Sequence, residues 1–229
     1  MTYGLRVIND NNYIQIDSEN PRLCAIHKGV YSSGSNTAII NFPTPITTVE
    51  PPCIFLQNSP SRPGDLYDIM TVTGSAGNWT GFTLRANNVT WRPTGKWFAA
   101  VFASVANSQY GIRLWDSAGK IVYDSGATPV IVTKANHNWI YQGKVQFPGL
   151  GAGYYWVNEL VAPLASDEYF MMNPFSRGAV GTTPIWANRG VRFDYSSSRL
   201  QMYLVTTSPT GPWIDQGQPA ALYARLPGS

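Results

Sequence analysis

Charged side chains are scarce in this sequence. Only 13% of its 229 residues are Asp, Glu, Lys or Arg, about half of the roughly 25% found in a typical soluble domain. Hydrophobic residues make up 44% of the chain and aromatic residues 13%. Disordered chains combine high charge with few aromatics, so this composition excludes intrinsic disorder. The shortage of charge also suggests that other subunits cover part of the uncharged surface.

The few basic residues do not form a patch. The net charge is only +3, and the arginines are spread singly from Arg6 to Arg225. Electrostatic binding to nucleic acid needs a concentrated basic surface, so we expect no nucleic-acid partner. No apolar stretch reaches the ~18 residues of a membrane-spanning helix, and the first residues lack the apolar core of a signal peptide. We therefore expect that the protein does not insert into a membrane and that it is made in a cytoplasm.

Residues that carry chemistry are few. The two cysteines, Cys24 and Cys53, lie in apolar segments. We interpret them as buried thiols, although a disulfide between them stays open. The two histidines, His27 and His137, belong to no nucleophile motif. No spacing indicates a zinc, calcium or phosphate site, and the sequence does not identify the two cooperating carboxylates that glycosidase chemistry requires. We expect no enzyme activity, no catalytic residue, no metal and no cofactor.

The residue types favour an all-β fold with little or no helix. Lys and Glu are scarce, whereas aromatics, Thr, Ser and Asn are plentiful. Residues 96–105 are apolar on both faces, which predicts a fully buried strand. Hairpins are predicted at residues 191–205 and at residues 82–91, where Asn87 and Asn88 would occupy a turn with positive φ.

One segment occurs twice in the chain. Residues 3–18, YGLRVINDNNYIQIDS, align without a gap with residues 110–125, YGIRLWDSAGKIVYDS, and six of the sixteen positions are identical. The identical pairs are Tyr3/Tyr110, Gly4/Gly111, Arg6/Arg113, Ile14/Ile121, Asp17/Asp124 and Ser18/Ser125. We interpret the repeat as a duplication. It predicts two β-sandwich-like domains, at residues 1–108 and 109–229, each opened by one copy.

Each copy is predicted to be a β-hairpin. A four-residue turn spans residues 9–12 in the first copy and 116–119 in the second. The last position of such a turn commonly needs a left-handed backbone, which Gly119 accepts. With this loop, Val7 would face Ile14 across the hairpin.

The charged residues that both copies keep have a structural role available. In the expected register Arg6 is the diagonal neighbour of Asp17, and Arg113 is that of Asp124. We expect each pair to form an ion pair that fixes the register. An exposed ion pair contributes only ~0.2–1 kcal/mol, so the apolar face of the hairpin must supply most of the stability.

Aromatic residues are concentrated between residues 139 and 156. They are Trp139, Tyr141, Tyr154, Tyr155 and Trp156. Sugar rings pack on exposed aromatic side chains, so a carbohydrate-binding β-sandwich module is the alternative function. A buried core or a subunit interface explains the same residues, since alternation along a strand places about half of them inside.

The repeated phrase, Tyr-Gly-aliphatic-Arg-aliphatic followed by Asp-Ser, resembles the opening of tailed-bacteriophage tail-tip and minor tail (tail-fibre-associated) proteins. The resemblance implies a non-enzymatic structural protein of the virion tail that joins other tail proteins of a tip or baseplate. It further implies a homo-oligomer, a trimer or hexamer by tail symmetry. A host-surface glycan or protein is an additional expected partner, since tail tips meet cell surfaces.

Overall fold

The computed structural model describes residues 6–8, 10, 14–17, 21–61, 65–104, 109–147, 151–160, 162–176, 187–206 and 218–228. At residues 6–7, 14–17 and 187–188 it describes the backbone alone. The described chain consists of strands and one short 3-10 helix, η1 (Asn173–Phe175), so the all-β class is confirmed. Within these ranges, no helix has the length and apolar character needed to cross a membrane.

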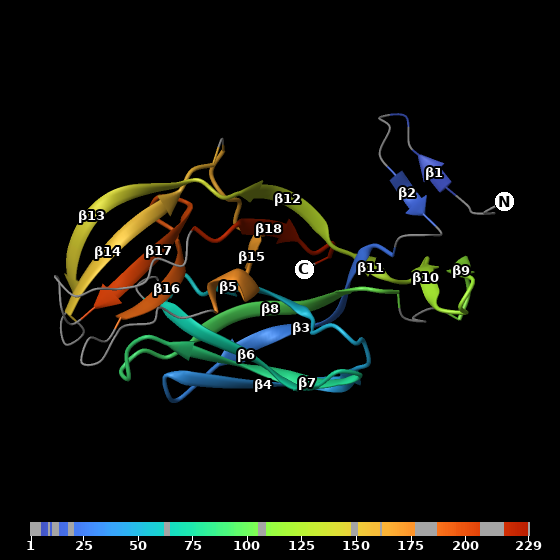
Figure 1. Ribbon diagram of the computed structural model, residues 1–229, viewed down its shortest axis with the longest axis horizontal. Coiled ribbons are helices and arrows are strands. Elements are labelled where there is room, and N and C mark those ends of the chain that lie inside the picture. Colours follow the sequence, from blue (N-terminus) through green and yellow to red (C-terminus); the bar gives the residue numbers. More distant parts are fainter. Residues whose placement is uncertain are drawn as a thin grey trace.

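Seven strands form the first large antiparallel sheet, in the order β11-β3-β8-β5-β15-β18-β12. Their bounds are β3 (Leu23–Ser32), β5 (Cys53–Asn58), β8 (Thr94–Phe102), β11 (Thr128–Pro129), β12 (Ile131–Asn136), β15 (Tyr169–Met171) and β18 (Ala221–Arg225). Only Val130 separates β11 from β12, so the two form one segment. Because β11 pairs with β3 at one edge and β12 pairs with β18 at the other, this segment closes the sheet into a ring (Figure 1). We call it the ring sheet.

The second large sheet is also antiparallel and has the order β13-β14-β17-β16-β6-β7-β4. Its strands are β4 (Thr37–Ile46), β6 (Tyr67–Ser75), β7 (Asn78–Ala86), β13 (Trp139–Phe147), β14 (Gly151–Asn158), β16 (Ala187–Asp194) and β17 (Arg199–Thr206). In Figure 1 it runs beneath the ring sheet and bends up beside it, so we call it the curved sheet.

The core has two parts because β8 is buried on both faces. Trp97 and Ala99 point into the layer between the two sheets. Phe98 and Ala100 point into the interior of the ring sheet, where Phe98 stacks on Phe55 with ring centroids 4.5 Å apart. This arrangement confirms burial on both faces for Trp97–Val101, whereas Phe102, at the end of β8 and inside the predicted range, is 63% exposed.

The two halves of the chain share both large sheets. In the ring sheet β3, β5 and β8 precede residue 108, whereas β11, β12, β15 and β18 follow it. In the curved sheet β16 pairs with β6 across the same point. The division expected between residues 1–108 and 109–229 therefore does not separate the sheets, because strand pairing and core packing both cross it.

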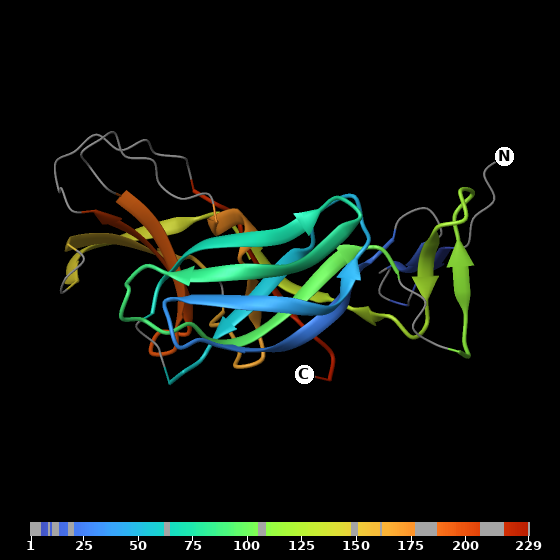
Figure 2. The same cartoon turned by 90° about the horizontal axis from the view of Figure 1, so that it is seen from below.

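The duplication corresponds to two small hairpins outside the large sheets. The first contains β1 (Arg6–Ile8) and β2 (Ile14–Asp17), and the second contains β9 (Arg113–Trp115) and β10 (Ile121–Asp124). Both project from the same end of the molecule, and β2 lies against β10 (Figures 1 and 2).

One of the other two predicted hairpins is present. β16 and β17 pair along their whole length, as residues 191–205 predicted. The prediction of a hairpin at residues 82–91 was wrong, because β7 ends at Ala86 and neither Asn87 nor Asn88 has a positive φ. The Asn88 side chain instead accepts a hydrogen bond from the backbone N–H of Thr90, which holds a loop.

Candidate functional site

The second hairpin turns at the residues that the sequence indicates. The N–H of Asp116 donates to the carbonyl of Lys120 at 2.9 Å, and the N–H of Gly119 donates to the carbonyl of Asp116 at 3.1 Å. Gly119 has a φ of +77°, the left-handed conformation that glycine accepts. The Asp116 carboxylate also accepts the N–H of Ala118 at 2.9 Å. Local backbone chemistry therefore fixes this turn.

The two hairpins have the same register, which differs from the expected one. Val7 pairs with Ile16 and not with Ile14, and Leu114 pairs with Tyr123 at the equivalent position. In both hairpins the register shifts at the same place, as a β-bulge would cause. The residue pattern did not predict this shift. Since the irregularity occurs in both copies, the hairpins are one structural unit present twice.

This register places the repeated Arg and Asp directly opposite each other in both hairpins. Arg113 Nε donates to Asp124 Oδ2 at 2.7 Å, and the buried Asp124 also accepts the N–H of Gly126 at 2.8 Å. The side chains of Arg6 and Asp17 lie outside the described part of the chain. In the second hairpin, the ion pair ties the two strands at their open end.

Three further residues that are identical in both copies of the repeat lie in the described part of the second copy. Ser125 closes its open end, because its N–H donates to the carbonyl of Ile112 and its Oγ accepts the N–H of Ile112. Gly111 has a φ of +134°, a conformation that favours glycine. Tyr110 differs from both, because it is 89% exposed. Packing against the described part of the chain does not account for the presence of this side chain.

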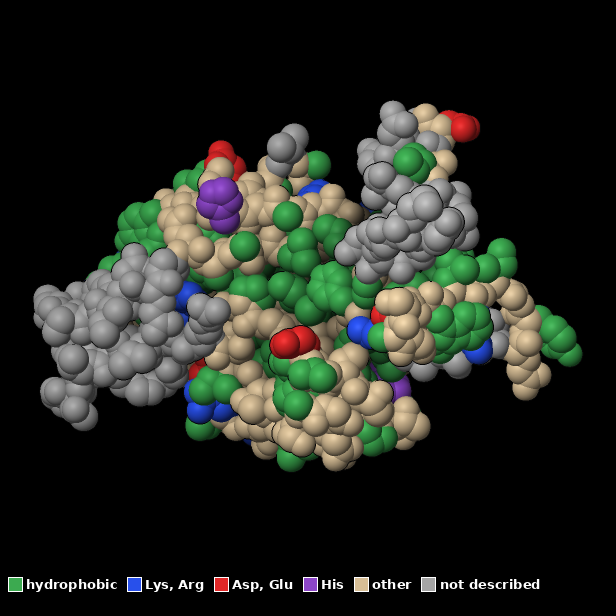
Figure 3. Space-filling view, turned by 45° about the vertical axis from the view of Figure 1, so that its right-hand side comes forward, with side chains coloured by type: hydrophobic (Ala, Val, Ile, Leu, Met, Phe, Trp, Pro, Cys, Tyr) green, Lys and Arg blue, Asp and Glu red, His purple; other side chains and the backbone are tan. Residues whose placement is uncertain are grey.

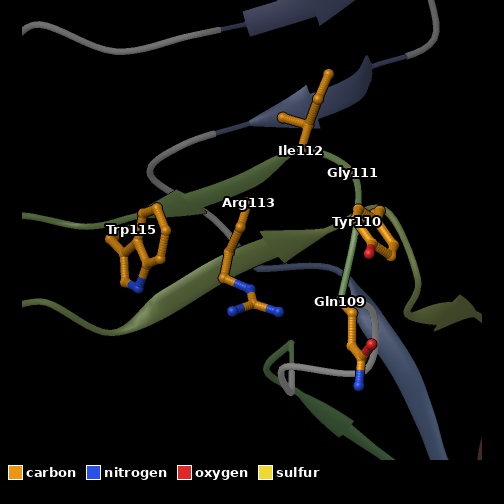
Figure 4. A pocket seen from close by; sticks show the side chains of 6 residues that line it. All are labelled: Gln109, Tyr110, Gly111, Ile112, Arg113 and Trp115. Carbon is orange, nitrogen blue, oxygen red and sulfur yellow. The ribbon is translucent and has the colours of Figure 1, made fainter.

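An open groove of about 320 Å³ runs along β9. Its lining residues, shown in Figure 4, are Gln109, Tyr110, Gly111, Ile112, Arg113 and Trp115. Arg113 and Trp115 point to one side of the strand and Ile112 to the other (Figure 4). Ile112 is 58% exposed and Trp115 54%, and Figure 3 shows hydrophobic side chains on the outside of this hairpin. We call Tyr110 and Trp115 the hairpin surface.

Two of the five aromatic residues considered for sugar binding are structural. Trp139 is buried in the core between the sheets, and its indole N–H donates to the carbonyl of Pro219 at 2.9 Å. Tyr155 lies on the opposite face of the curved sheet and stacks on Tyr203 with ring centroids 5.1 Å apart. Trp139 has no open face on which a sugar could stack.

The other three, Tyr141, Tyr154 and Trp156, share the inner face of β13 and β14, and we call them the aromatic ledge. Tyr141 pairs with Trp156 across the strands, with ring centroids 5.4 Å apart. Lys144 pairs with Tyr154, and its Nζ lies 5.7 Å from the tyrosine ring centroid. Sequence reasoning missed Lys144, because strict alternation from Tyr141 assigns it to the other face.

Residues that often carry chemistry have structural surroundings here. Cys24 and Cys53 are free thiols, and burial raises the pKa of both. His27 Nε2 donates to the carbonyl of Thr44 at 2.8 Å, and its ring stacks on Phe42. In the described ranges, no three or more His, Cys, Asp or Glu side chains are grouped so that they could hold a metal ion.

No protein-family model matches this sequence, and neither a curated protein nor a solved structure matches it. Within the described residues, the hairpin surface and the aromatic ledge are the features from which we argue a function.

Proposed function

We propose that this protein is a structural component of a phage tail tip or tail-fibre assembly, and that it docks onto neighbouring tail proteins through its hairpin surface. The observation that carries the proposal is Tyr110, which is almost fully exposed. Its counterpart Tyr3 is identical in sequence but lies outside the described residues. An exposed aromatic residue that the sequence repeats is best explained by contact with a partner. The resemblance of the repeated phrase to tail proteins supports the same role.

The chemistry of the hairpin surface suits an interface. Tyr and Trp are the residues that most often dominate binding energy at protein interfaces, and Tyr110 and Trp115 flank the groove along β9. The ion pair of Arg113 with Asp124 and the turn at Gly119 hold these side chains on a fixed backbone. A preordered surface loses less entropy on binding. The protein would act by binding alone, without turnover.

Phage particles that contain this chain provide the test. Mass spectrometry of purified particles should detect it among the tail proteins. The double variant Tyr110→Ala/Trp115→Ala should lower its amount per particle by roughly tenfold or more, since each truncation removes an interface anchor. The melting temperature of the purified variant should stay unchanged, because both side chains are exposed.

Ile39→Ala is the matched control, since Ile39 is a large exposed apolar residue on β4, away from both hairpins. It should enter particles at the wild-type level. Particles that lack the chain, or equal incorporation of the double variant and the wild type, would contradict the proposal. Light scattering of the purified wild type measures the trimer or hexamer that belongs to the same proposal.

A further inference from the structure

A β-bulge in the edge strand β13 brings Lys144 to the face of the aromatic ledge. Tyr141 pairs with Trp156, and the register then shifts before Gly143, whose φ of +120° favours glycine. Because the shift interrupts the alternation of side chains, Tyr141 and Lys144 both reach the face that carries Trp156. Bulges commonly re-aim side chains in this way beside functional sites.

The three rings of the ledge are partly or largely exposed to solvent, and one of them is packed against the core. Trp156 packs against the core between the sheets, and its neighbour Tyr141 is 53% exposed. Tyr154 is partly exposed beside the ammonium group of Lys144. Aromatic side chains have only two rotatable bonds, so they bind a ligand at little cost in entropy. The ledge therefore combines flat apolar surfaces with a cation and tyrosine hydroxyl groups.

A pyranose sugar has matching chemistry. One face of its ring presents C–H groups, which stack on an aromatic ring, and its rim presents hydroxyl groups. A sugar that extends along the ledge from Tyr141 to Tyr154 would meet the Lys144 ammonium, which lies 5.7 Å from the Tyr154 ring centroid and donates charge-assisted hydrogen bonds. We infer that the aromatic ledge binds a pyranose glycan.

The same strand is poorly suited to receive a protein strand, which is the other common occupant of a sheet edge. β13 is the last strand of the curved sheet, but it carries a bulge and the exposed Lys144. Both features hinder pairing at an edge. This inference goes beyond the proposed assembly role, and it uses the end of the molecule away from the two hairpins (Figure 1).

An array of immobilised bacterial surface polysaccharides tests the inference with the full chain. At least one polysaccharide should retain the wild type. Tyr141→Ala should weaken that binding by roughly tenfold or more, since it removes the most exposed ring of the ledge. Tyr110→Ala is the matched control, because it removes an exposed tyrosine from the hairpin surface and should leave glycan binding unchanged.

Two results would overturn the inference: a wild-type protein that no polysaccharide on the array retains, or equal weakening by Tyr141→Ala and Tyr110→Ala. If Tyr141→Ala also lowers the melting temperature, Lys144→Gln replaces it, because Lys144 is exposed and its loss should weaken binding without affecting the fold. Incorporation into particles depends on Tyr110, whereas retention by glycans depends on Tyr141. Failure of either proposal is therefore distinguishable from failure of the other.

Discussion

The ion pair between Lys134 and Glu168 links β12 to the start of β15, across the intervening strand β18 of the ring sheet. Lys134 lies on β12, the closing strand, and Glu168 immediately precedes β15. The Nζ of Lys134 contacts both carboxylate oxygens of Glu168, at 2.6 and 2.7 Å, and the N–H of Ala165 donates to Oε2 at 2.6 Å. Glu168 is only 2% exposed. Its charge is therefore buried and depends on these partners.

Lys134→Met leaves this buried carboxylate without its cation. Removing one partner of a buried ion pair costs about 3–5 kcal/mol. In a chain of this size each kcal/mol lowers the melting temperature by roughly 2–4 °C, so the variant should melt roughly 6–20 °C below the wild type near pH 7. The adjacent Asp167 provides the matched control. It pairs with Arg225 at 3.1 Å but is exposed, so Asp167→Asn should cost less than ~1 kcal/mol.

The pH dependence separates the charge effect from lost packing. Burial alone would raise the pKa of Glu168, but the hydrogen bonds from Lys134 and Ala165 outweigh burial and lower this pKa. A carboxyl group with a lowered pKa stabilises the fold above its unfolded pKa, about 4.3, and this stabilisation is lost as the pH falls through the folded pKa. The difference between the wild type and Lys134→Met should therefore shrink below about pH 4.

Guanidinium chloride unfolding, followed by tryptophan fluorescence near pH 7 and near pH 3, measures this difference directly. A loss below ~1 kcal/mol near pH 7 would show that the pair contributes no more than an exposed one. An equal loss at both pH values would attribute the effect to packing of the Lys134 side chain, and the electrostatic reasoning would be refuted.

Two further substitutions test the ring interior and the second hairpin. Phe98→Ala removes a ring that stacks on Phe55 inside the ring sheet and should cost about 3–5 kcal/mol in denaturant unfolding; a cost below ~1.5 kcal/mol would show that this interior is loosely packed. Asp124→Asn weakens the charge-assisted hydrogen bond from Arg113 and should lower the stability of the second hairpin by about 1–3 kcal/mol. In this variant, amide hydrogen exchange should accelerate in residues 112–125 and stay unchanged in the two large sheets. Faster exchange throughout the chain would contradict a local role.

The sequence predicts those strands whose burial leaves a simple pattern. β8 is apolar at every central position because both of its faces are covered, and the Ser-rich turn marks the hairpin of β16 and β17. The closure of the ring sheet has no such sequence pattern, because β11 and β12 pair with strands that are far away in the chain. The hairpin predicted at Asn87 and Asn88 was wrong because asparagine fits a loop as well as a hairpin turn.

The candidate sites were predictable in part. The repeat located both hairpins and identified Arg113 and Asp124 as partners, because duplicated residues with opposite charge have a local reason to meet. The bulges were not predictable, and they decide the facing of every residue beyond them. Alternation of residues likewise does not predict that Trp139 is buried and Tyr141 exposed. It assigns residues to the two faces of a strand, but it does not predict how much of each face other elements cover.

The low charge of the chain has a more specific meaning once the two interiors are known. A fold that fills both a ring and an intersheet layer needs many apolar residues, and thirteen of its thirty Phe, Trp and Tyr residues are buried there. Composition alone therefore does not require a surface covered by subunits. The informative residues are those that neither interior uses, above all Tyr110 and Tyr141. The second hairpin and β13 lie at opposite ends of the molecule (Figure 1), so a partner bound at the hairpin would leave the ledge free, as the two proposals together require.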